Sequence, residues 1–190
     1  CGLIQNSGAG LGIDFGAGVV NVNTTLPSNQ WFHLVITRQS GTARVFLNGQ
    51  LTYTSALATN YPTSQSIYIG GYPGYAQNWD GYLSNFKIEK GAVPSLYQTS
   101  STTVGAQIFT PPTSPVVSDA NTSVLTCQSN RFADSSSNAY TVTPTLTPSV
   151  QKFSPFLPNL PYESSRLGAS GYFDGTTDSL QLANNTAFDP

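Results

Sequence analysis

Short runs in which apolar and polar residues alternate, each bounded by Gly, Pro, Asn or Ser, are the feature that most constrains the fold of this chain. No segment longer than a turn places its apolar residues at helical spacing. Runs of this kind, rich in β-branched and aromatic residues, predict strands. We therefore expect an all-β protein. The expected strands cover residues 31–38, 44–47, 51–53, 65–69, 81–89, 123–128, 172–173 and 180–182.

Two of these runs carry more specific signals. Residues 31–38, WFHLVITR, have apolar side chains on both faces, which predicts a central strand that is covered on both sides. Asn48 and Gly49 separate two alternating runs. This dipeptide favours a type I′ hairpin because both central residues of that turn need a positive φ. The sequence therefore predicts a buried strand followed by a tight hairpin.

Proline interrupts the pattern twice. Three prolines in residues 111–115 prevent regular pairing in a sheet interior, so we expect an irregular Pro-rich strap there, anchored by Phe109 and Val116. A second Pro-rich stretch, residues 157–167, is expected to be a semi-rigid connector. Residues 168–190 resume the alternation but are too short to bury a face alone. They must pair with the main body, with another copy or with a further domain.

Charge is scarce in this sequence. Of its 190 residues, 8% are Asp, Glu, Lys or Arg, compared with roughly 25% in ordinary soluble domains. The net charge is −2 and the basic residues are scattered, which excludes a nucleic-acid backbone as the partner. No apolar run approaches the roughly 20 residues that a membrane span needs. This balance is typical of an extracellular or particle-bound β protein.

The residues that catalysis needs are not found together. Glycoside hydrolysis uses two carboxylates about 5 to 9.5 Å apart. Glu89 and Glu163 are distant in sequence, and the residues between Asp174 and Asp178 indicate a turn. His33, the only histidine, lies among apolar residues and is expected to belong to the core or to a sheet face. We therefore expect no enzymatic activity.

Disulfide and metal candidates are few. Cys1 and Cys127 could form one disulfide bond, but a single pair so far apart in sequence is not a disulfide framework. We expect buried or unpaired thiols. A single histidine excludes metal centres that need two or more imidazoles. No cofactor is expected, with calcium as the open alternative. Asp14 and Asp80 could contribute oxygen ligands, although no calcium-loop motif is present.

The segment GGYPGYAQNWDG, residues 70–81, is the best candidate for a ligand surface in the sequence. Aromatic rings can stack on sugar rings, while neighbouring amides and carboxylates bind hydroxyl groups. The alternative is that these aromatic residues pack against the strap or a neighbouring subunit. The candidate glycan-binding residues are Tyr72, Tyr75, Gln77, Asn78, Trp79 and Asp80.

The succession of WFHLVITR, RVFLNGQ, SIYIGG and GYLSNFKI resembles the laminin G-like branch of the concanavalin A-like lectins and glucanases over residues 10–90. This resemblance implies an antiparallel jelly-roll β-sandwich. Residues 1–156 would form one sandwich without its first strands, and residues 168–190 would open a following module or be a strand donated to another copy. The matching positions are Trp31, His33, Arg38, Asn48, Gly49, Gly70, Gly71, Gly81, Asn85 and Ile88.

Residues 109–156 are similar to the segment that follows such sandwiches in structural proteins of tailed phages, especially those of marine cyanobacteria. The resemblance implies a non-enzymatic virion module on a tail fibre, a tail accessory protein or a capsid-surface fibre. It is carried by the spacing of Pro111, Pro112, Leu125, Cys127, Arg131, Phe132, Asp134, Phe153 and Phe156.

A module of this type implies three kinds of partner. These are copies of the same chain, with a homotrimer as the fibre-like expectation, other virion proteins, and glycans of the host surface. Neither nucleic acid nor membrane insertion is expected, and the protein would lie at the virion surface. The alternative is a carbohydrate-binding lectin module of a secreted or cell-surface bacterial adhesin, which would bind through residues 70–81.

Overall fold

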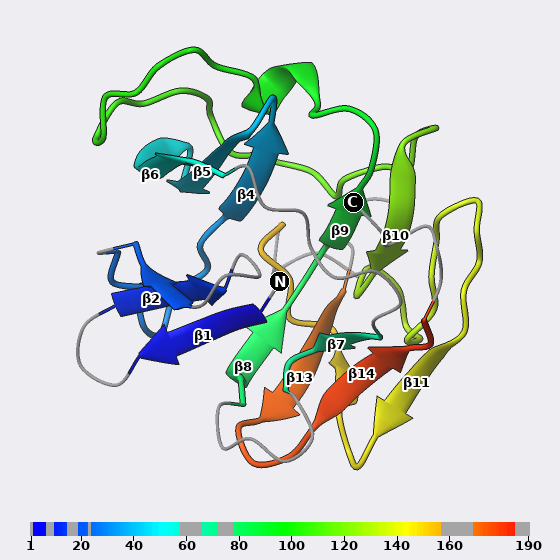
Figure 1. Ribbon diagram of the computed structural model, residues 1–190. Helices are drawn as coiled ribbons and strands as arrows, with labels where there is room; N and C mark the ends of the chain where they lie inside the picture. The colour runs from blue at the N-terminus through cyan, green and yellow to red at the C-terminus, as the bar shows by residue number, and fades with distance from the viewer. Residues whose placement is uncertain are drawn as a thin grey trace. The chain divides into compact units, whose positions relative to one another are not determined.

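Short strands joined by tight turns make up the secondary structure (Figure 1). Every strand pair in the described residues is antiparallel, which confirms the all-β, antiparallel prediction. The described chain divides into unit 1, residues 2–57 and 92–111, and unit 2, residues 66–91 and 112–184. The computed structural model describes residues 2–6, 10–14, 19–22, 24–57, 66–71, 78–156 and 169–184.

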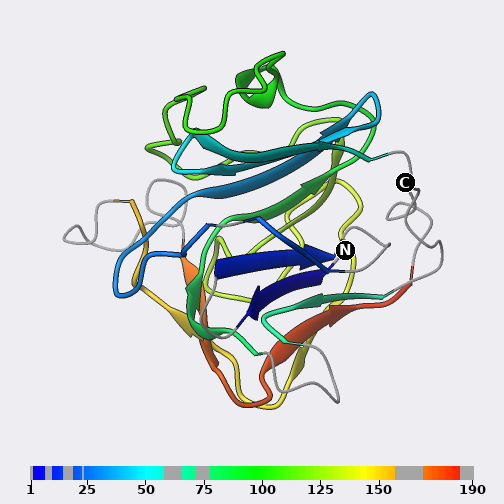
Figure 2. The ribbon, with the colours of Figure 1, turned by 60° about the vertical axis from the view of Figure 1, so that its left-hand side comes forward.

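Unit 1 contains two three-stranded sheets, with strand orders β1-β2-β3 and β4-β5-β6. Figure 2 shows the strands of the second sheet running side by side, coloured blue to cyan. One short 3-10 helix, η1, follows later in the chain. The bounds are β1 (Gly2–Asn6), β2 (Gly10–Asp14), β3 (Val19–Asn21), β4 (Leu34–Gln39), β5 (Thr42–Leu47), β6 (Gln50–Ala56) and η1 (Ser95–Tyr97).

Unit 2 contains two three-stranded sheets, β11-β14-β7 and β12-β13-β8, and the pair β10-β9. Strands from the C-terminal segment are central in both larger sheets, so in this structure residues 169–184 pair with the main body. The expected connector, residues 157–167, lies outside the described residues. The bounds are β7 (Ile67–Ile69), β8 (Asp80–Leu83), β9 (Phe86–Glu89), β10 (Thr122–Thr126), β11 (Val142–Thr145), β12 (Ser149–Gln151), β13 (Ser170–Asp174) and β14 (Ser179–Leu182).

The predicted hairpin turn at Asn48 and Gly49 is confirmed. Their φ angles are 51° and 82°, and Leu47 pairs with Gln50 on either side of the turn. The Asn48 side chain also accepts a hydrogen bond from the His33 backbone N at 2.8 Å, and the Asn48 backbone N donates to the His33 carbonyl at 2.8 Å. Asn48 therefore makes both hydrogen bonds to the His33 backbone, just before β4 begins.

The prediction of a central strand over residues 31–38 is wrong in two respects. Strand β4 begins only at Leu34, because β5 ends at its partner Leu47 and the chain then turns away. Strand β4 also lies at the end of the described β4-β5-β6 order, and β5 is central. Val45 and Phe46 of β5 are both 0% exposed, which shows that β5 is the strand covered on both faces.

The predicted strand over residues 81–89 is two strands. Asn85 separates β8 from β9 and has a φ of 56°, in the left-handed region that Asn tolerates better than most residues. Strand β8 pairs with β13, whereas β9 pairs with β10. The strands that the sequence did not predict are interrupted by glycine or are only three to five residues long, namely β1, β2, β3, β11 and β12.

The buried apolar residues of the described ranges form three hydrophobic clusters. Leu11, Ile13, Val22, Ala43 and Val45 form the first cluster of unit 1. The second cluster of unit 1 is built on Phe46, Leu51 and Phe109. The cluster of unit 2 consists of Ile69, Val124, Cys127, Val142, Phe173, Leu180 and Leu182.

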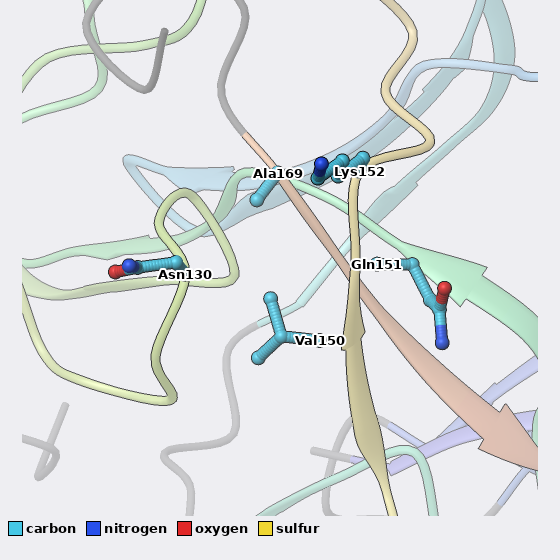
Figure 3. Close-up of a pocket in the computed structure, with 5 residues that line it drawn as sticks. All are labelled: Asn130, Val150, Gln151, Lys152 and Ala169. Atoms are coloured by element: carbon cyan, nitrogen blue, oxygen red, sulfur yellow. The ribbon is translucent and has the colours of Figure 1, made fainter. Parts of the chain in front are cut away.

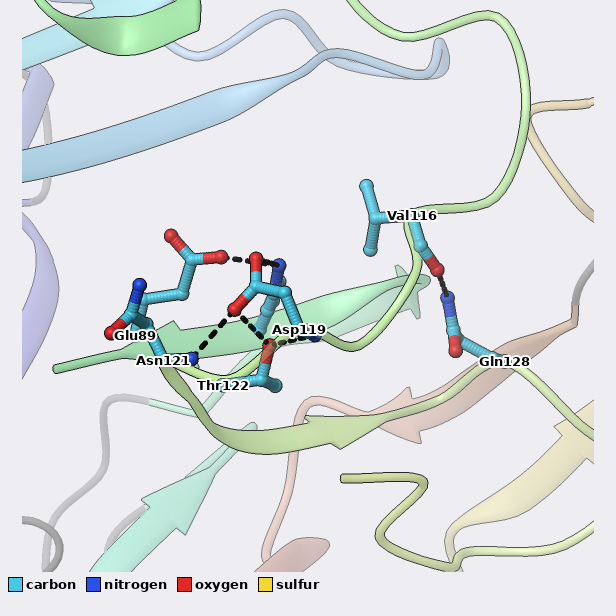
Figure 4. A network of polar contacts seen from close by, with 7 residues as sticks. Glu89, Val116, Asp119, Asn121, Thr122 and Gln128 are labelled. Carbon is cyan, nitrogen blue, oxygen red and sulfur yellow. Dashed lines mark hydrogen bonds and ion pairs between the residues drawn. The ribbon is translucent and has the colours of Figure 1, made fainter. Parts of the chain in front are cut away.

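The Pro-rich strap is confirmed, together with both of its expected anchors. Phe109 is 6% exposed and belongs to the second cluster of unit 1. In unit 2 the Val116 backbone is held by two side chains. Its N–H donates to Asn85 Oδ1 at 3.0 Å. Its carbonyl accepts from Gln128 Nε2 at 2.6 Å (Figure 4). Side chains thus supply the hydrogen bonds that a proline-rich segment cannot obtain from a sheet.

A polar network fixes the turn before β10 onto β9 (Figure 4). The Asp119 carboxylate accepts hydrogen bonds from the Asn121 backbone N at 2.8 Å and from the Thr122 hydroxyl at 3.1 Å. Its other oxygen lies 3.2 Å from Lys87 Nζ, which also pairs with Glu89. The Asn121 hydrogen bond, followed by the one from Lys87, lowers the pKa of Asp119 to about 2. Asp119 is therefore ionised at neutral pH.

Candidate functional site

The structure describes half of the predicted glycan-binding residues. Asn78 and Trp79 lie just before β8, and Asp80 begins it. The side chain of Asn78 donates to the carbonyl oxygen of Thr176, so it is already used within unit 2. The others, Tyr72, Tyr75 and Gln77, lie outside the described residues.

Trp79 is only half-buried, and its ring packs against the hydrophobic cluster of unit 2. Its backbone N donates to the Gly70 carbonyl at 2.7 Å. These contacts give Trp79 a packing role at the base of residues 70–81. The assignment of Trp79 to a glycan site stays a prediction.

Asp80 lies on the exposed face of the β12-β13-β8 sheet. It is the cross-strand partner of Asp174, and both residues are exposed. Backbone hydrogen bonds, above all the one from Thr176 N at 2.9 Å, lower the pKa of Asp174. A Cβ atom on Gly175 would lie 2.7 Å from the Asp80 Cβ, so the turn after β13 passes close against Asp80. Asp80 and Asp174 are thus exposed cross-strand partners, and the Asp174 carboxylate also accepts a hydrogen bond from its own turn.

An aromatic face lies next to this carboxylate pair; we define it as Tyr82, Tyr172 and Phe153. Tyr82 and Tyr172 are cross-strand partners, with ring centroids 5.2 Å apart. Phe153, which follows β12, lies 5.0 Å from Tyr82 in an edge-to-face arrangement. Tyr82 is 39% exposed and Phe153 is 47% exposed. Tyr82 and Phe153 are therefore exposed on one sheet face, with the half-buried Tyr172 against Tyr82.

Strand alternation explains why these residues share a face. Side chains two residues apart point the same way, so Asp80 lies beside Tyr82, and Asp174 lies beside Tyr172. The next residues along each strand point inward: Phe173, between Tyr172 and Asp174, is 0% exposed in the cluster of unit 2, and Leu83, after Tyr82, packs against that cluster. Because Phe173 of β13 points into the core, its neighbours Tyr172 and Asp174 point to the opposite, outer face of the sheet.

This surface provides the groups that sugar recognition uses. Exposed rings offer flat apolar area, and carboxylate oxygens accept hydrogen bonds from hydroxyl groups. Glycoside hydrolysis by the same carboxylates would require one of them to stay protonated as the general acid. The pKa of Asp174 is shifted in the opposite direction, downward. Asp174 is therefore not that acid, and its carboxylate is an ionised hydrogen-bond acceptor.

A pocket of about 280 Å³ opens at the β12 edge of the same sheet (Figure 3). Figure 3 shows Val150 and Gln151 pointing to opposite sides of the strand. Lys152 is the one charged residue among those that line the pocket. The pocket is lined by Asn130, Val150, Gln151, Lys152 and Ala169.

The other titratable candidates have structural partners. Glu89 pairs with Lys87, and burial is the largest cause of its raised pKa. The buried carboxylate of Asp178 accepts hydrogen bonds from the Thr147 N at 2.9 Å and from the Asp174 N at 3.3 Å. Asp178 therefore holds the β13–β14 turn, and it is not presented on the exposed face.

Cys127 is a free, buried thiol. Burial raises its pKa to about 12, so it is unreactive at neutral pH. Its φ of 59° ends the alternation of β10, so it joins the same cluster as Val124.

The two calcium candidates lie in different units: Asp14 ends β2 in unit 1, and Asp80 begins β8 in unit 2. Within the described ranges, no group of three or more His, Cys, Asp or Glu residues is placed to hold a metal ion. No described helix is long and apolar enough to cross a membrane.

His33 is half-buried between aromatic rings of unit 1. Its ring lies 6.1 Å from that of Tyr97 and 5.9 Å from that of Phe109. Its Nδ1 atom is buried and has no hydrogen-bond partner among the described residues. Burial lowers the pKa of His33 from its ordinary value of 6.5, because the charged imidazolium loses hydration there. This environment is that of a packed side chain.

His33 should make the stability of unit 1 depend on pH. Below pH 6.5 the unfolded chain takes up a proton that the folded chain resists, so the free energy of unfolding decreases as the pH falls from 6.5 towards the lowered pKa. A His33→Gln variant should lack this component. Urea unfolding of both proteins between neutral and mildly acidic pH measures it, and parallel curves would contradict the prediction.

The aromatic face was missed by the sequence analysis, although a weak signal exists. Tyr82 and Tyr172 both occur in a Gly-Tyr pair inside a short alternating run. Such a pattern places each tyrosine on one side of a strand. It does not reveal that β8 and β13, which are about 90 residues apart in sequence, are neighbours.

Comparison with known proteins supports the sandwich class. Residues 4–95 match the family model of the concanavalin A-like lectin/glucanases superfamily. The matched range contains Asp80 and Tyr82, whereas Phe153, Tyr172 and Asp174 follow it. Searches of curated proteins and of solved structures find no match. With its antiparallel sheets, the chain is consistent with a β-sandwich of this class.

Proposed function

We propose that this chain is a non-enzymatic adhesion module that binds glycans through the aromatic face. The observation that carries the proposal is the contact of Tyr82 with Phe153 and Tyr172, two exposed rings and one half-buried ring, next to two exposed carboxylates. Large apolar side chains gathered on a sheet surface are typical of a binding site rather than of a solvated face. The similarity to a superfamily that includes lectins is compatible with this role.

The setting that we propose is the surface of a tailed-phage virion, on a tail fibre, a tail accessory protein or a capsid-surface fibre. Its low content of charged residues and the resemblance of residues 109–156 support this setting. In this proposal the module associates with its own copies and with other virion proteins, and the aromatic face contacts the host surface. No catalytic step and no cofactor are part of this function.

A glycan array tests the binding function. We expect the protein to retain at least one glycan, and Tyr172→Ala to weaken that binding about tenfold, since a flat ring stacked on an aromatic side chain contributes roughly 1–3 kcal/mol where the stacked ring is a nucleobase. Trp79→Ala is the matched aromatic control, because Trp79 packs at the base of residues 70–81. Weaker binding by Trp79→Ala alone would place the site in residues 70–81. An array without any retained glycan would contradict the proposal.

A further inference from the structure

We infer that the aromatic face selects glycans that carry a protonated amino group, which would lie between Asp80 and Asp174 and against the tyrosine rings. This inference rests on the proposed glycan-binding function and adds a ligand class to it. Its basis is the juxtaposition of a carboxylate pair and a tyrosine pair at successive outward positions of the same two strands.

The register of β8 and β13 creates this arrangement. Asp80 pairs with Asp174 and Tyr82 pairs with Tyr172, so the two cross-strand pairs are neighbours on one face of the sheet. Directly opposed residues in an antiparallel pair have Cβ atoms about 4.5–5.5 Å apart. A single ammonium group can therefore reach both carboxylates and still contact a ring.

The negative charge of the aspartate pair favours a cation as the ligand. Like charges placed directly opposite each other destabilise a strand pair, and a cation between them would relieve that repulsion. Asp174 is ionised because backbone N–H groups lower its pKa. Strands β8, β12 and β13 contain no Lys or Arg, and no ion pair to either aspartate occurs within the described ranges. Among the described residues, these two carboxylates thus have no cationic partner.

The aromatic rings act in the same direction. The face of a tyrosine or phenylalanine ring attracts ammonium groups, most strongly within about 6 Å of the ring centroid. A neutral sugar gains only stacking and hydroxyl contacts at this surface, whereas an amino sugar gains the charge contacts as well. An acidic sugar would be repelled by Asp80 and Asp174.

Two oligosaccharides with the same backbone distinguish binding of an amino sugar from binding of a neutral sugar. The glucosamine hexamer carries amino groups that are charged at mildly acidic pH, and the N-acetylglucosamine hexamer carries neutral amides. We expect titration calorimetry to show the glucosamine hexamer binding about fivefold more tightly, a gain consistent with exposed ion pairs and cation–π contacts. High salt should reduce the difference because the charges are screened.

Variants assign the preference to the carboxylates. The Asp80→Asn/Asp174→Asn protein keeps an oxygen acceptor at each position, and we expect it to bind both hexamers equally. Asp119→Asn removes a carboxylate from the turn before β10 and should keep the preference. Equal binding of both hexamers by the wild type, lost in Tyr172→Ala, would overturn the amino-sugar inference and leave the glycan-binding function standing. No binding of the glucosamine hexamer would also overturn the inference, and the array result would then decide the proposed function.

Discussion

Replacing Phe173 by alanine is expected to lower the free energy of unfolding of unit 2 by about 3–5 kcal/mol, the usual cost of deleting a buried phenylalanine ring. Phe173 is 0% exposed and packs in the cluster that β7, β10, β11 and β14 share. A Cβ on Gly70 would lie 2.3 Å from its ring, so the backbone already closes tightly around this side chain. Neighbouring residues therefore have little freedom to fill the cavity.

Urea unfolding followed by the fluorescence of Trp79 measures this loss, because Trp79 packs on the same cluster. A Trp31→Phe background removes the other tryptophan signal. Phe153→Ala is the matched control, since Phe153 is 47% exposed and its removal should cost less than about 1 kcal/mol. Equal effects of the two substitutions would contradict the assignment of Phe173 to the core and Phe153 to the surface.

Gly49→Ala is expected to destabilise unit 1 by about 2–4 kcal/mol, because it combines an unfavourable backbone conformation with a steric clash. Gly49 has a φ of 82°, and an added Cβ would lie 1.9 Å from the Phe109 carbonyl oxygen. The clash should push the strap away from the hairpin, to which it is joined by the hydrogen bond from Ile108 N to the Gly49 carbonyl at 2.9 Å.

Gly41→Ala separates the two causes. Gly41 also has a positive φ, 71°, but the nearest atom to an added Cβ, the Leu57 carbonyl oxygen, would be 3.9 Å away. Strain alone should cost about 1 kcal/mol there. Urea unfolding followed by the fluorescence of Trp31, in a Trp79→Phe background, compares the two variants. If Gly41→Ala were as destabilising as Gly49→Ala, the close docking of the strap on the hairpin would be contradicted.

Local patterns in the sequence predicted the local structure well. The Asn48-Gly49 turn follows from the φ requirement of a two-residue hairpin, and the strap follows from proline's missing N–H. The edge position of β4 could not be predicted, because the burial of a strand depends on its neighbours. The break at Asn85 was missed for a similar reason, since its left-handed conformation is stabilised by side-chain contacts to Val116 and Gln128.

The candidate site shows the same limit more clearly. Sequence analysis selected residues 70–81 because aromatic and polar residues are consecutive there. The aromatic face instead combines residues from three separate parts of the chain, Tyr82, Phe153 and Tyr172, and only the pairing of β8, β13 and β12 brings them together. Long-range strand pairing is not encoded in any local pattern, so this surface could be found only in the structure.

NMR of the tyrosine rings tests the location of the glycan-binding site most directly. Protein with labelled tyrosines would be titrated with a glycan that the array identifies. We predict that the largest shift changes occur at Tyr82 and Tyr172, with smaller ones elsewhere. Shift changes confined to Tyr72 and Tyr75 would contradict this account and return the binding site to residues 70–81.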